Sequence, residues 1–95
     1  MNNYTFKEAE YLVRFYFDVR DRQKKQKDTR EGEEETLGEI MDYAMARLDE
    51  EGRRILHNEF ELNYPKQWWQ DYYSKSSYYA IKGRAMRSFL AKMHR

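Results

Sequence analysis

The sequence contains no cysteine, only one proline and four glycines in 95 residues. Without cysteine there are no disulfide bridges, no thiolate nucleophile and no zinc site that needs a sulfur ligand. No apolar run approaches 18 residues and no charged segment leads into an apolar one, so we expect neither a membrane-spanning helix nor a signal peptide. These absences predict a cytoplasmic protein with no membrane partner.

Aromatic side chains are abundant, at 17 % of the residues, and they include nine tyrosines and two tryptophans. A chain this short buries a smaller fraction of its surface than a larger domain does. Large aromatic side chains compensate because each one offers an extensive contact area. We therefore expect one small domain whose stability depends on a few aromatic residues.

The net charge of +1 hides an uneven distribution along the chain. The charge is +3 over residues 1–30, −8 over residues 31–62 and +6 over residues 63–95. Asp71 is the only acidic residue of the last third, where lysine and arginine alternate with tyrosine and tryptophan. A surface of this composition attracts a polyanion.

A first helix is predicted from Thr5 to about Lys27, within an N-terminal segment 1–30. Thr5 and Glu8 have the spacing of a capping box, which satisfies two backbone donors at a helix start. Seven of the nine residues from Tyr11 to Val19 are apolar. A helix this apolar does not lie on a surface with one face in water. It is either enclosed in the domain or shared with a second copy of the chain.

The stretch from Arg20 to Thr36 contains no apolar side chain and is predicted to be a solvated helix end followed by a charged linker, residues 31–36. Its three consecutive glutamates, Glu33 to Glu35, suit a solvated helix start better than a cation site. Such a site needs oxygen ligands at wider spacing and a glycine turn.

Four further helices are predicted after the linker. Thr36 and Glu39 again have capping-box spacing, Asp49 is a cap for the next helix, and Asn63-Tyr64-Pro65 ends it. Pro65 to about Tyr72 forms a short helix, and Ser74 caps a last helix that runs to about Met93. Since no useful period-two alternation occurs, the fold class is predicted to be all-α, with five helices.

Three short helices with a tight break after the second and a basic third helix have the order of a trihelical helix-turn-helix. The segment "LDEEGRRILHNEFELNYPKQWWQDYYSKSSYYAIKGRAMRSF" resembles region four of the main bacterial sigma factors. It is more similar still to phage transcriptional regulators of the ArpU type, most specifically from Tyr73 to Leu90. The resemblance implies a DNA-binding domain over residues 37–95 without sigma activity, because the promoter-melting and polymerase-binding regions are missing.

The resemblance extends to individual positions. Leu48, Arg53, Ile55 and Leu56 match the first helix of the family, Ser74 matches the serine that begins its recognition helix, Ser77 matches a frequent threonine, and Arg84-Ala85 matches an Arg-Ala pair. Three positions differ. Trp68 and Trp69 replace an Ile-Ala pair of the supporting helix, and Lys82 falls where sigma factors prefer leucine, so that Ile81 is predicted to fill that role.

The last helix also has the pattern of a recognition helix on physical grounds. With Tyr78, Ile81, Ala85 and Phe89 inward, about 100° per residue turns Ser76, Tyr79, Ala80, Gly83 and Arg87 outward. Small and hydroxyl side chains there would let the backbone approach DNA closely. The alternative is an ordinary solvated face. The residues expected to contact DNA are Lys75, Ser76, Ser77, Tyr79, Lys82, Arg84 and Arg87.

The sequence thus predicts a small non-catalytic phage or mobile-element regulator that binds duplex DNA as a homodimer, with no catalytic residue, metal or cofactor. Host RNA polymerase is a candidate partner for the acidic middle segment. Two alternatives stay open: a DNA-recognition subunit of a phage packaging terminase, and a helical adaptor that binds protein only. His57 and His94 are too far apart in sequence to suggest a metal pair.

Overall fold

The computed structural model describes residues 4–25 and 31–94, with side chains for 4–25 and 37–94. Its α-helices are α1 (Phe6–Lys25), α2 (Glu31–Ala46), α3 (Glu50–Leu56) and α4 (Lys75–Met93). A π-helical turn, η1 (His57–Glu61), continues α3, and a 3-10 turn, η2 (Trp68–Asp71), precedes α4. No strand occurs in the described ranges, which confirms the all-α prediction. The predicted segment 1–30 and its helix end at Lys27 extend outside the described residues.

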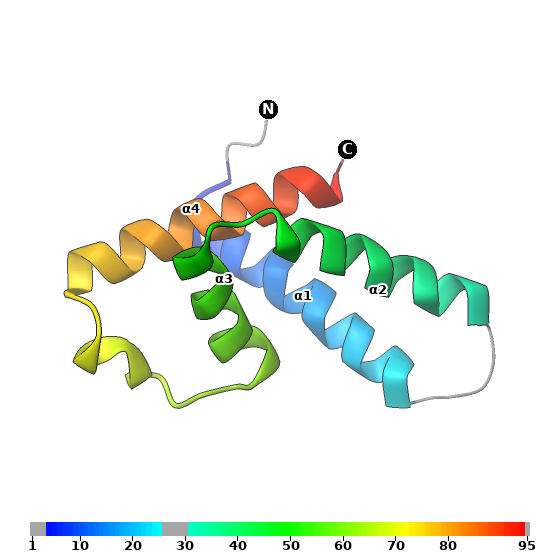
Figure 1. The fold of residues 1–95 in the computed structure, drawn as a ribbon, viewed down its shortest axis with the longest axis horizontal. Helices are drawn as coiled ribbons and strands as arrows, with labels where there is room; N and C mark the ends of the chain where they lie inside the picture. The colour runs from blue at the N-terminus through cyan, green and yellow to red at the C-terminus, as the bar shows by residue number, and fades with distance from the viewer. Residues whose placement is uncertain (1–3, 26–30, 95) are drawn as a thin grey trace.

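Helix α4 is the element around which the others are arranged (Figure 1). It runs along the long direction of the molecule, and α1, α2 and α3 all pack against it. Helix α3 packs against the N-terminal half of α4, and α2 lies toward the C-terminal end of α4. The two short turns η1 and η2 connect α3 to the start of α4.

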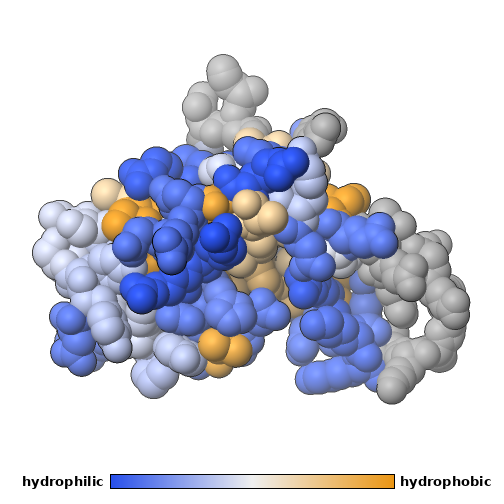
Figure 2. Space-filling model, viewed as in Figure 1, coloured by the Kyte–Doolittle hydropathy of each residue, from blue (hydrophilic) through white to orange (hydrophobic). Residues whose placement is uncertain are grey.

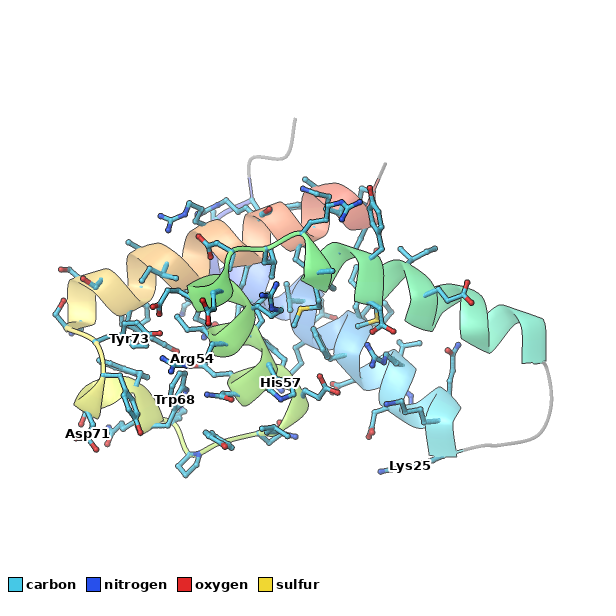
Figure 3. All side chains as sticks on the ribbon, in the orientation of Figure 1. Lys25, Arg54, His57, Trp68, Asp71 and Tyr73 are labelled. Carbon is cyan, nitrogen blue, oxygen red and sulfur yellow. The ribbon has the colours of Figure 1, made fainter. Side chains whose placement is uncertain are left out.

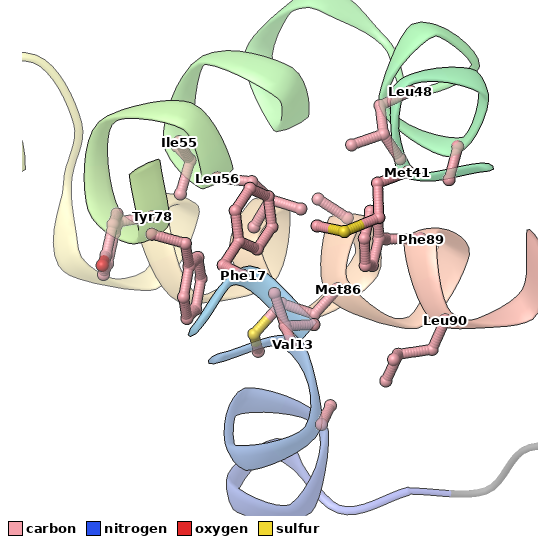
Figure 4. Close-up of a cluster of buried hydrophobic side chains, with 14 of the residues drawn as sticks. Val13, Phe17, Met41, Leu48, Ile55, Leu56, Tyr78, Met86, Phe89 and Leu90 are labelled. Carbon is pink, nitrogen blue, oxygen red and sulfur yellow. The ribbon is translucent and has the colours of Figure 1, made fainter. Parts of the chain in front are cut away.

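The hydrophobic core draws on all four α-helices (Figure 4). Phe17 of α1 stacks on Phe60 of η1 at 5.9 Å and on Phe89 of α4 at 5.7 Å between ring centroids. Met41 of α2 and Leu56 of α3 are fully buried beside them. Since side chains far apart in the sequence share one core, the described chain forms a single packed unit.

Three of the predicted helix caps are confirmed. At α1, Glu8 N donates to Thr5 Oγ1 at 3.1 Å and Thr5 N donates to Glu8 Oε1 at 3.0 Å, so the capping box is complete. Asp49 Oδ1 accepts a hydrogen bond from Gly52 N at 2.9 Å at the start of α3. Ser74 Oγ accepts one from Ser77 N at 3.2 Å at the start of α4. The short-range pattern therefore placed three helix starts correctly.

The predicted linker over residues 31–36 is wrong, because α2 begins at Glu31 and includes them. Thr36 accordingly lies inside the helix and is not its cap. The physical reason is that glutamate favours helix formation and its negative charge is stabilised near a helix N-terminus. A run without apolar residues suits a linker, but the same run also satisfies the preferences of a first helical turn.

The predicted helix from Pro65 to Tyr72 is replaced by the four residues of η2. Its hydrogen bonds join residues three apart, as from Tyr72 N to the Trp69 carbonyl at 2.9 Å. Before it, Leu62 N donates to the His57 carbonyl at 3.0 Å, and this i to i+5 bond closes the π-helical turn. Asn63 then adopts a left-handed conformation with φ of 54°, which asparagine tolerates better than most residues and which ends the helix.

Helix α1 packs one side against the rest of the domain and leaves the other side open, so enclosure in the domain accounts for only part of its apolar surface. Ala9, Val13 and Phe17 form its buried side. Its opposite side keeps Tyr11 71 % exposed and Phe15 49 % exposed. None of the helices in the described ranges combines the length and the apolarity needed to cross a lipid bilayer.

We predict that substitution by alanine has opposite effects on stability at two helical glycines. A Cβ atom at Gly52 would lie 2.9 Å from the Cβ of Ala85, where α3 crosses α4, whereas a Cβ at Gly38 meets nothing within 4 Å. We expect Gly52→Ala to lower the free energy of unfolding by about 1 kcal/mol through overpacking. Gly38→Ala should raise it by about 1 kcal/mol, because alanine favours helix formation. Urea unfolding of both variants checks the difference in sign, and equal shifts would contradict the close crossing of α3 and α4.

Candidate nucleic-acid interface

One side of α4 is open to solvent along its whole length. We call it the α4 stripe, and it consists of Ser76, Ser77, Ala80, Arg84, Arg87 and Ala91, all exposed. At about 100° per residue these six positions fall within one third of the helix circumference. Of the seven residues predicted to contact DNA, the structure brings Ser76, Ser77, Arg84 and Arg87 together on this stripe. Lys75 is exposed in the first turn but lies about 100° around the helix from Ser76, off the stripe.

Tyr79 and Gly83 lie toward α1 and not on the stripe. The Tyr79 ring contacts Phe6 of α1 at 5.5 Å and Trp69 of η2 at 6.1 Å, and it remains 43 % exposed. Gly83 is buried, and a Cβ built there lies 3.4 Å from the Phe6 ring. The prediction that Gly83 faces outward is therefore wrong, because the start of α1 covers this side of α4.

Lys82 is the main correction among the predicted DNA contacts. It is only 4 % exposed, so it lies inside the domain and not on its surface. Its Nζ forms ion pairs with Glu59 Oε1 at 2.7 Å and with Glu10 Oε2 at 2.8 Å. A buried ammonium needs such partners because desolvation of an unpaired charge is costly. Lys82 therefore occupies the internal position predicted for Ile81, and Ile81 is only partly buried.

Glu59 on the π-helical turn is the centre of this buried polar group. Besides the Lys82 ammonium it accepts hydrogen bonds from Trp68 Nε1 at 2.8 Å and from the Tyr78 hydroxyl. We call Glu10, Glu59, Trp68, Tyr78 and Lys82 the Glu59 cluster. It joins α1, η1, η2 and α4, so it fixes the start of α4 relative to the rest of the domain.

Tyr78 is fixed both by this cluster and by stacking. Its ring lies 4.3 Å from that of Trp69, and the two planes differ by 9°. Burial, and after it the hydrogen bond to Glu59, raises the pKa of the Tyr78 hydroxyl above its ordinary value. The hydroxyl therefore stays protonated and donates to the carboxylate throughout the neutral range.

A second set of contacts ties the turn before α4 to α3. Arg54 Nη1 donates to the Tyr73 hydroxyl at 3.4 Å, and this hydroxyl donates to Glu51. Figure 3 shows Arg54, Tyr73 and Trp68 grouped at the end of the molecule where α4 begins, while Lys25 lies at the opposite end. The start of α4 is thus held by its N-cap, by the Glu59 cluster and by Tyr73.

A groove of about 450 Å³ opens over the Glu59 cluster. Its rim includes the exposed cations Lys7, Arg14 and Lys66, and its wall is formed by aromatic residues of the loop, η2 and α4. Lys82 at its floor is already paired with two carboxylates. The groove floor therefore needs no ligand to balance its charge.

The two arginines of the α4 stripe are held only weakly. Arg84 Nη2 lies 4.0 Å from Asp49 Oδ2, and both side chains are largely exposed. Arg87 Nε donates to the Tyr4 carbonyl at 3.3 Å, again on the surface. Exposed contacts of this length contribute little to stability, so either guanidinium is available to a competing anion.

Sequence reasoning missed Glu10 and Glu59 as partners of Lys82. The signal that could have found them is the place of Lys82 four residues after Tyr78 and three before Ala85, both predicted inward, because a lysine at an internal position demands a nearby carboxylate. Glu59 is three residues after Leu56 of the buried face, a spacing that places it near the same side of the helix.

No group of three or more histidine, aspartate or glutamate side chains in the described part of the chain is placed to hold a metal ion. The face seen in Figure 2 is predominantly hydrophilic, with small separate hydrophobic areas. No protein-family model, curated protein or solved structure matches this chain, so its resemblance to ArpU-type regulators stays an expectation from its sequence.

Proposed function

We propose that this protein binds duplex DNA through the α4 stripe, without catalysis, as a small phage or mobile-element transcriptional regulator. The observation that carries the proposal is the stripe itself, an exposed helix side with small residues in its first half and two arginines in its second. In this proposal α4 is the recognition helix, and α3 with η2 forms the part of a helix-turn-helix that crosses the DNA backbone.

The first half of the stripe suits close approach to a groove of DNA. Ser76, Ser77 and Ala80 have short side chains, so the helix backbone can come near base edges and phosphates. Ser74 satisfies the backbone donor of Ser77, and the amides of Lys75 and Ser76 remain at the helix N-terminus. Such amides bind phosphate well because the helix dipole adds a partial positive charge there.

The charge of the stripe also favours a polyanion. Helix α4 contains no acidic residue, and Lys75, Arg84 and Arg87 are exposed on it. Arginine binds phosphate through two parallel hydrogen bonds, which are stronger than its weak contacts in the free protein. We infer that Arg84 exchanges Asp49 for a phosphate when DNA binds.

A rigid platform behind the stripe supports the proposal further. The stack of Trp69 on Tyr78 and the Glu59 cluster hold the first turns of α4 from inside the domain. Side chains that read DNA need such support because base contacts depend on small differences in position.

We predict that Arg84→Ala combined with Arg87→Ala weakens binding to a mixed-sequence duplex and reduces its salt dependence. Each lost phosphate contact lowers the slope of log affinity against log salt by roughly 0.9, so the double variant should lose about twice that. Fluorescence anisotropy with a labelled duplex across a salt series measures the slope. Lys82 is left out because its removal would destabilise the core.

The matched control removes two cations far from the stripe. Arg22 and Lys24 are exposed in the last turn of α1, beside Lys25 at the opposite end of the molecule (Figure 3). Arg22→Ala with Lys24→Ala changes the net charge equally and should leave the slope nearly unchanged. Identical slopes for wild type and for the Arg84/Arg87 variant would show that DNA does not bind at the stripe. Absence of any duplex binding would favour the protein-binding adaptor.

Pairing of two copies completes the proposed function. Helix-turn-helix proteins commonly bind as dimers, with half-sites about one helical turn apart. A homodimer is consistent with regulation, whereas a packaging subunit would assemble into a much heavier ring. Host RNA polymerase remains the proposed protein partner of the acidic segment 31–62, whose net charge is −8.

A further inference from the structure

The open side of α1 carries residues that find no partner within the described chain. Lys7, Tyr11 and Asp18 make no ion pair or ring contact with other described residues. Tyr11 is the most exposed large hydrophobic residue, at 71 %. A shallow hollow of about 450 Å³ lies around it, lined by Glu10, Tyr11, Arg14, Phe15 and Asp18. Two exposed aromatic side chains, Tyr11 and Phe15, beside such a hollow are typical of an interaction site.

The order of charges along this side is self-complementary. Lys7, Tyr11, Arg14 and Asp18 follow one another at spacings of four, three and four residues, which is the seam of an antiparallel or parallel helix pair. When a second α1 runs antiparallel, Lys7 can lie opposite Asp18 of the second copy while Tyr11 lies opposite its Arg14. A two-fold axis repeats both contacts, so four favourable pairs form at once.

Pairing of Tyr11 with Arg14 of the second copy is compatible with the contact that Arg14 already makes in its own chain. Its guanidinium lies 4.8 Å from the centroid of the Phe60 ring of the same chain. A planar guanidinium has two faces, and the second can stack on Tyr11 of the other copy. Phe15 lies beside this seam and would lose its 49 % exposure against the same tyrosine.

We propose that two copies of this chain pair through α1 in antiparallel orientation, with Lys7 opposite Asp18 and Tyr11 opposite Arg14 of the second copy. This deepens the pairing in the proposed function by naming the surface and the register. It rests on the proposed pairing and not on DNA binding, so the tests are done without DNA.

Charge reversal tests the register. Lys7→Glu places two acids opposite each other and Asp18→Lys places two lysines opposite each other, so each single variant should have the monomer mass of 11.8 kDa where wild type has twice that. Light scattering from about 10 µM to about 1 mM covers the range expected for an interface below standard size. The Lys7→Glu variant is not expected to unfold, because an acidic side chain in the first turn of a helix is favourable. The control Lys24→Glu changes an exposed cation of α1 off the seam and should stay dimeric.

Mixing the two single variants is the decisive measurement. Glu at position 7 of one chain then meets Lys at position 18 of the other, and Asp18 meets Lys7, so an equimolar mixture should recover the dimer mass. The double variant Lys7→Glu/Asp18→Lys should also recover it by itself. A monomeric wild type at every concentration would overturn the proposal. So would a dimer that either single variant leaves intact, because the second copy would then bind elsewhere.

The two proposals fail in different ways. The Arg84/Arg87 double variant should remain a dimer, since neither residue lies on α1. The Lys7→Glu variant should keep salt-dependent binding of one copy to duplex DNA. Loss of the dimer mass in the Arg84→Ala/Arg87→Ala variant would contradict the assignment of the interface to α1. It would indicate instead that α4 forms the interface.

Discussion

Replacement of Glu59 with alanine is expected to lower the free energy of unfolding by about 3–5 kcal/mol, because it breaks a buried ion pair from one side. Lys82 would keep only Glu10, whose side chain is more exposed, and two donors of the Glu59 cluster would lose their acceptor. A loss of this size is a large fraction of the stability of a small domain. Urea unfolding followed by circular dichroism measures it.

Two further variants distinguish the loss of the buried ion pair from a general effect of removing an acidic side chain. Glu61, two residues along the same turn, lies 3.1 Å from His57 and 3.9 Å from Arg20, which also pairs with Asp42. Glu61→Ala should therefore cost about 1 kcal/mol or less. The double variant Glu59→Leu/Lys82→Met replaces both charges with apolar groups and should be more stable than Glu59→Ala, since no buried charge remains unpaired. If Glu59→Ala costs no more than Glu61→Ala, the cluster does not hold the start of α4.

Trp69→Ala is expected to cost about 3–5 kcal/mol, as large aromatic truncations in a core do. Trp69 is 8 % exposed and stacks on Tyr78 with ring centroids 4.3 Å apart, so its removal leaves a cavity next to the first turns of α4. Thermal unfolding monitored by circular dichroism measures the loss of stability.

The neighbouring Trp68 provides the matched comparison. It is half-buried and donates one hydrogen bond to Glu59 at 2.8 Å, so Trp68→Ala should cost about 1.5–3 kcal/mol, the usual range for a bond to a charged group. Fluorescence distinguishes the two indoles, because the variant that retains only Trp69 should emit at shorter wavelength. Equal and small losses for both variants would indicate that neither tryptophan is structural.

Several features of this protein follow from its sequence alone because they depend on neighbouring residues. The capping box of Thr5 and Glu8 and the caps Asp49 and Ser74 each join residues three apart, and all three were predicted at the correct position. The all-α class follows equally, since helical spacing of apolar residues is a local property. The basic last third of the chain is also visible in the sequence, whatever the fold.

Tertiary structure alone decided which side of α4 is open. A helical wheel gives the angles between residues but does not show which neighbouring elements cover each side of the helix. In the folded chain the start of α1 covers Gly83, and Lys82 is buried in ion pairs with Glu10 and Glu59. Lys82, one of the four cations predicted to contact DNA, is therefore part of the core. In the same way η2 is shorter than the predicted helix, and its two tryptophans contact different partners: Trp69 stacks on Tyr78, and Trp68 donates to Glu59. Contacts between residues as far apart as Glu10 and Lys82 form only when the chain is folded, and the stability of a buried charge depends on them.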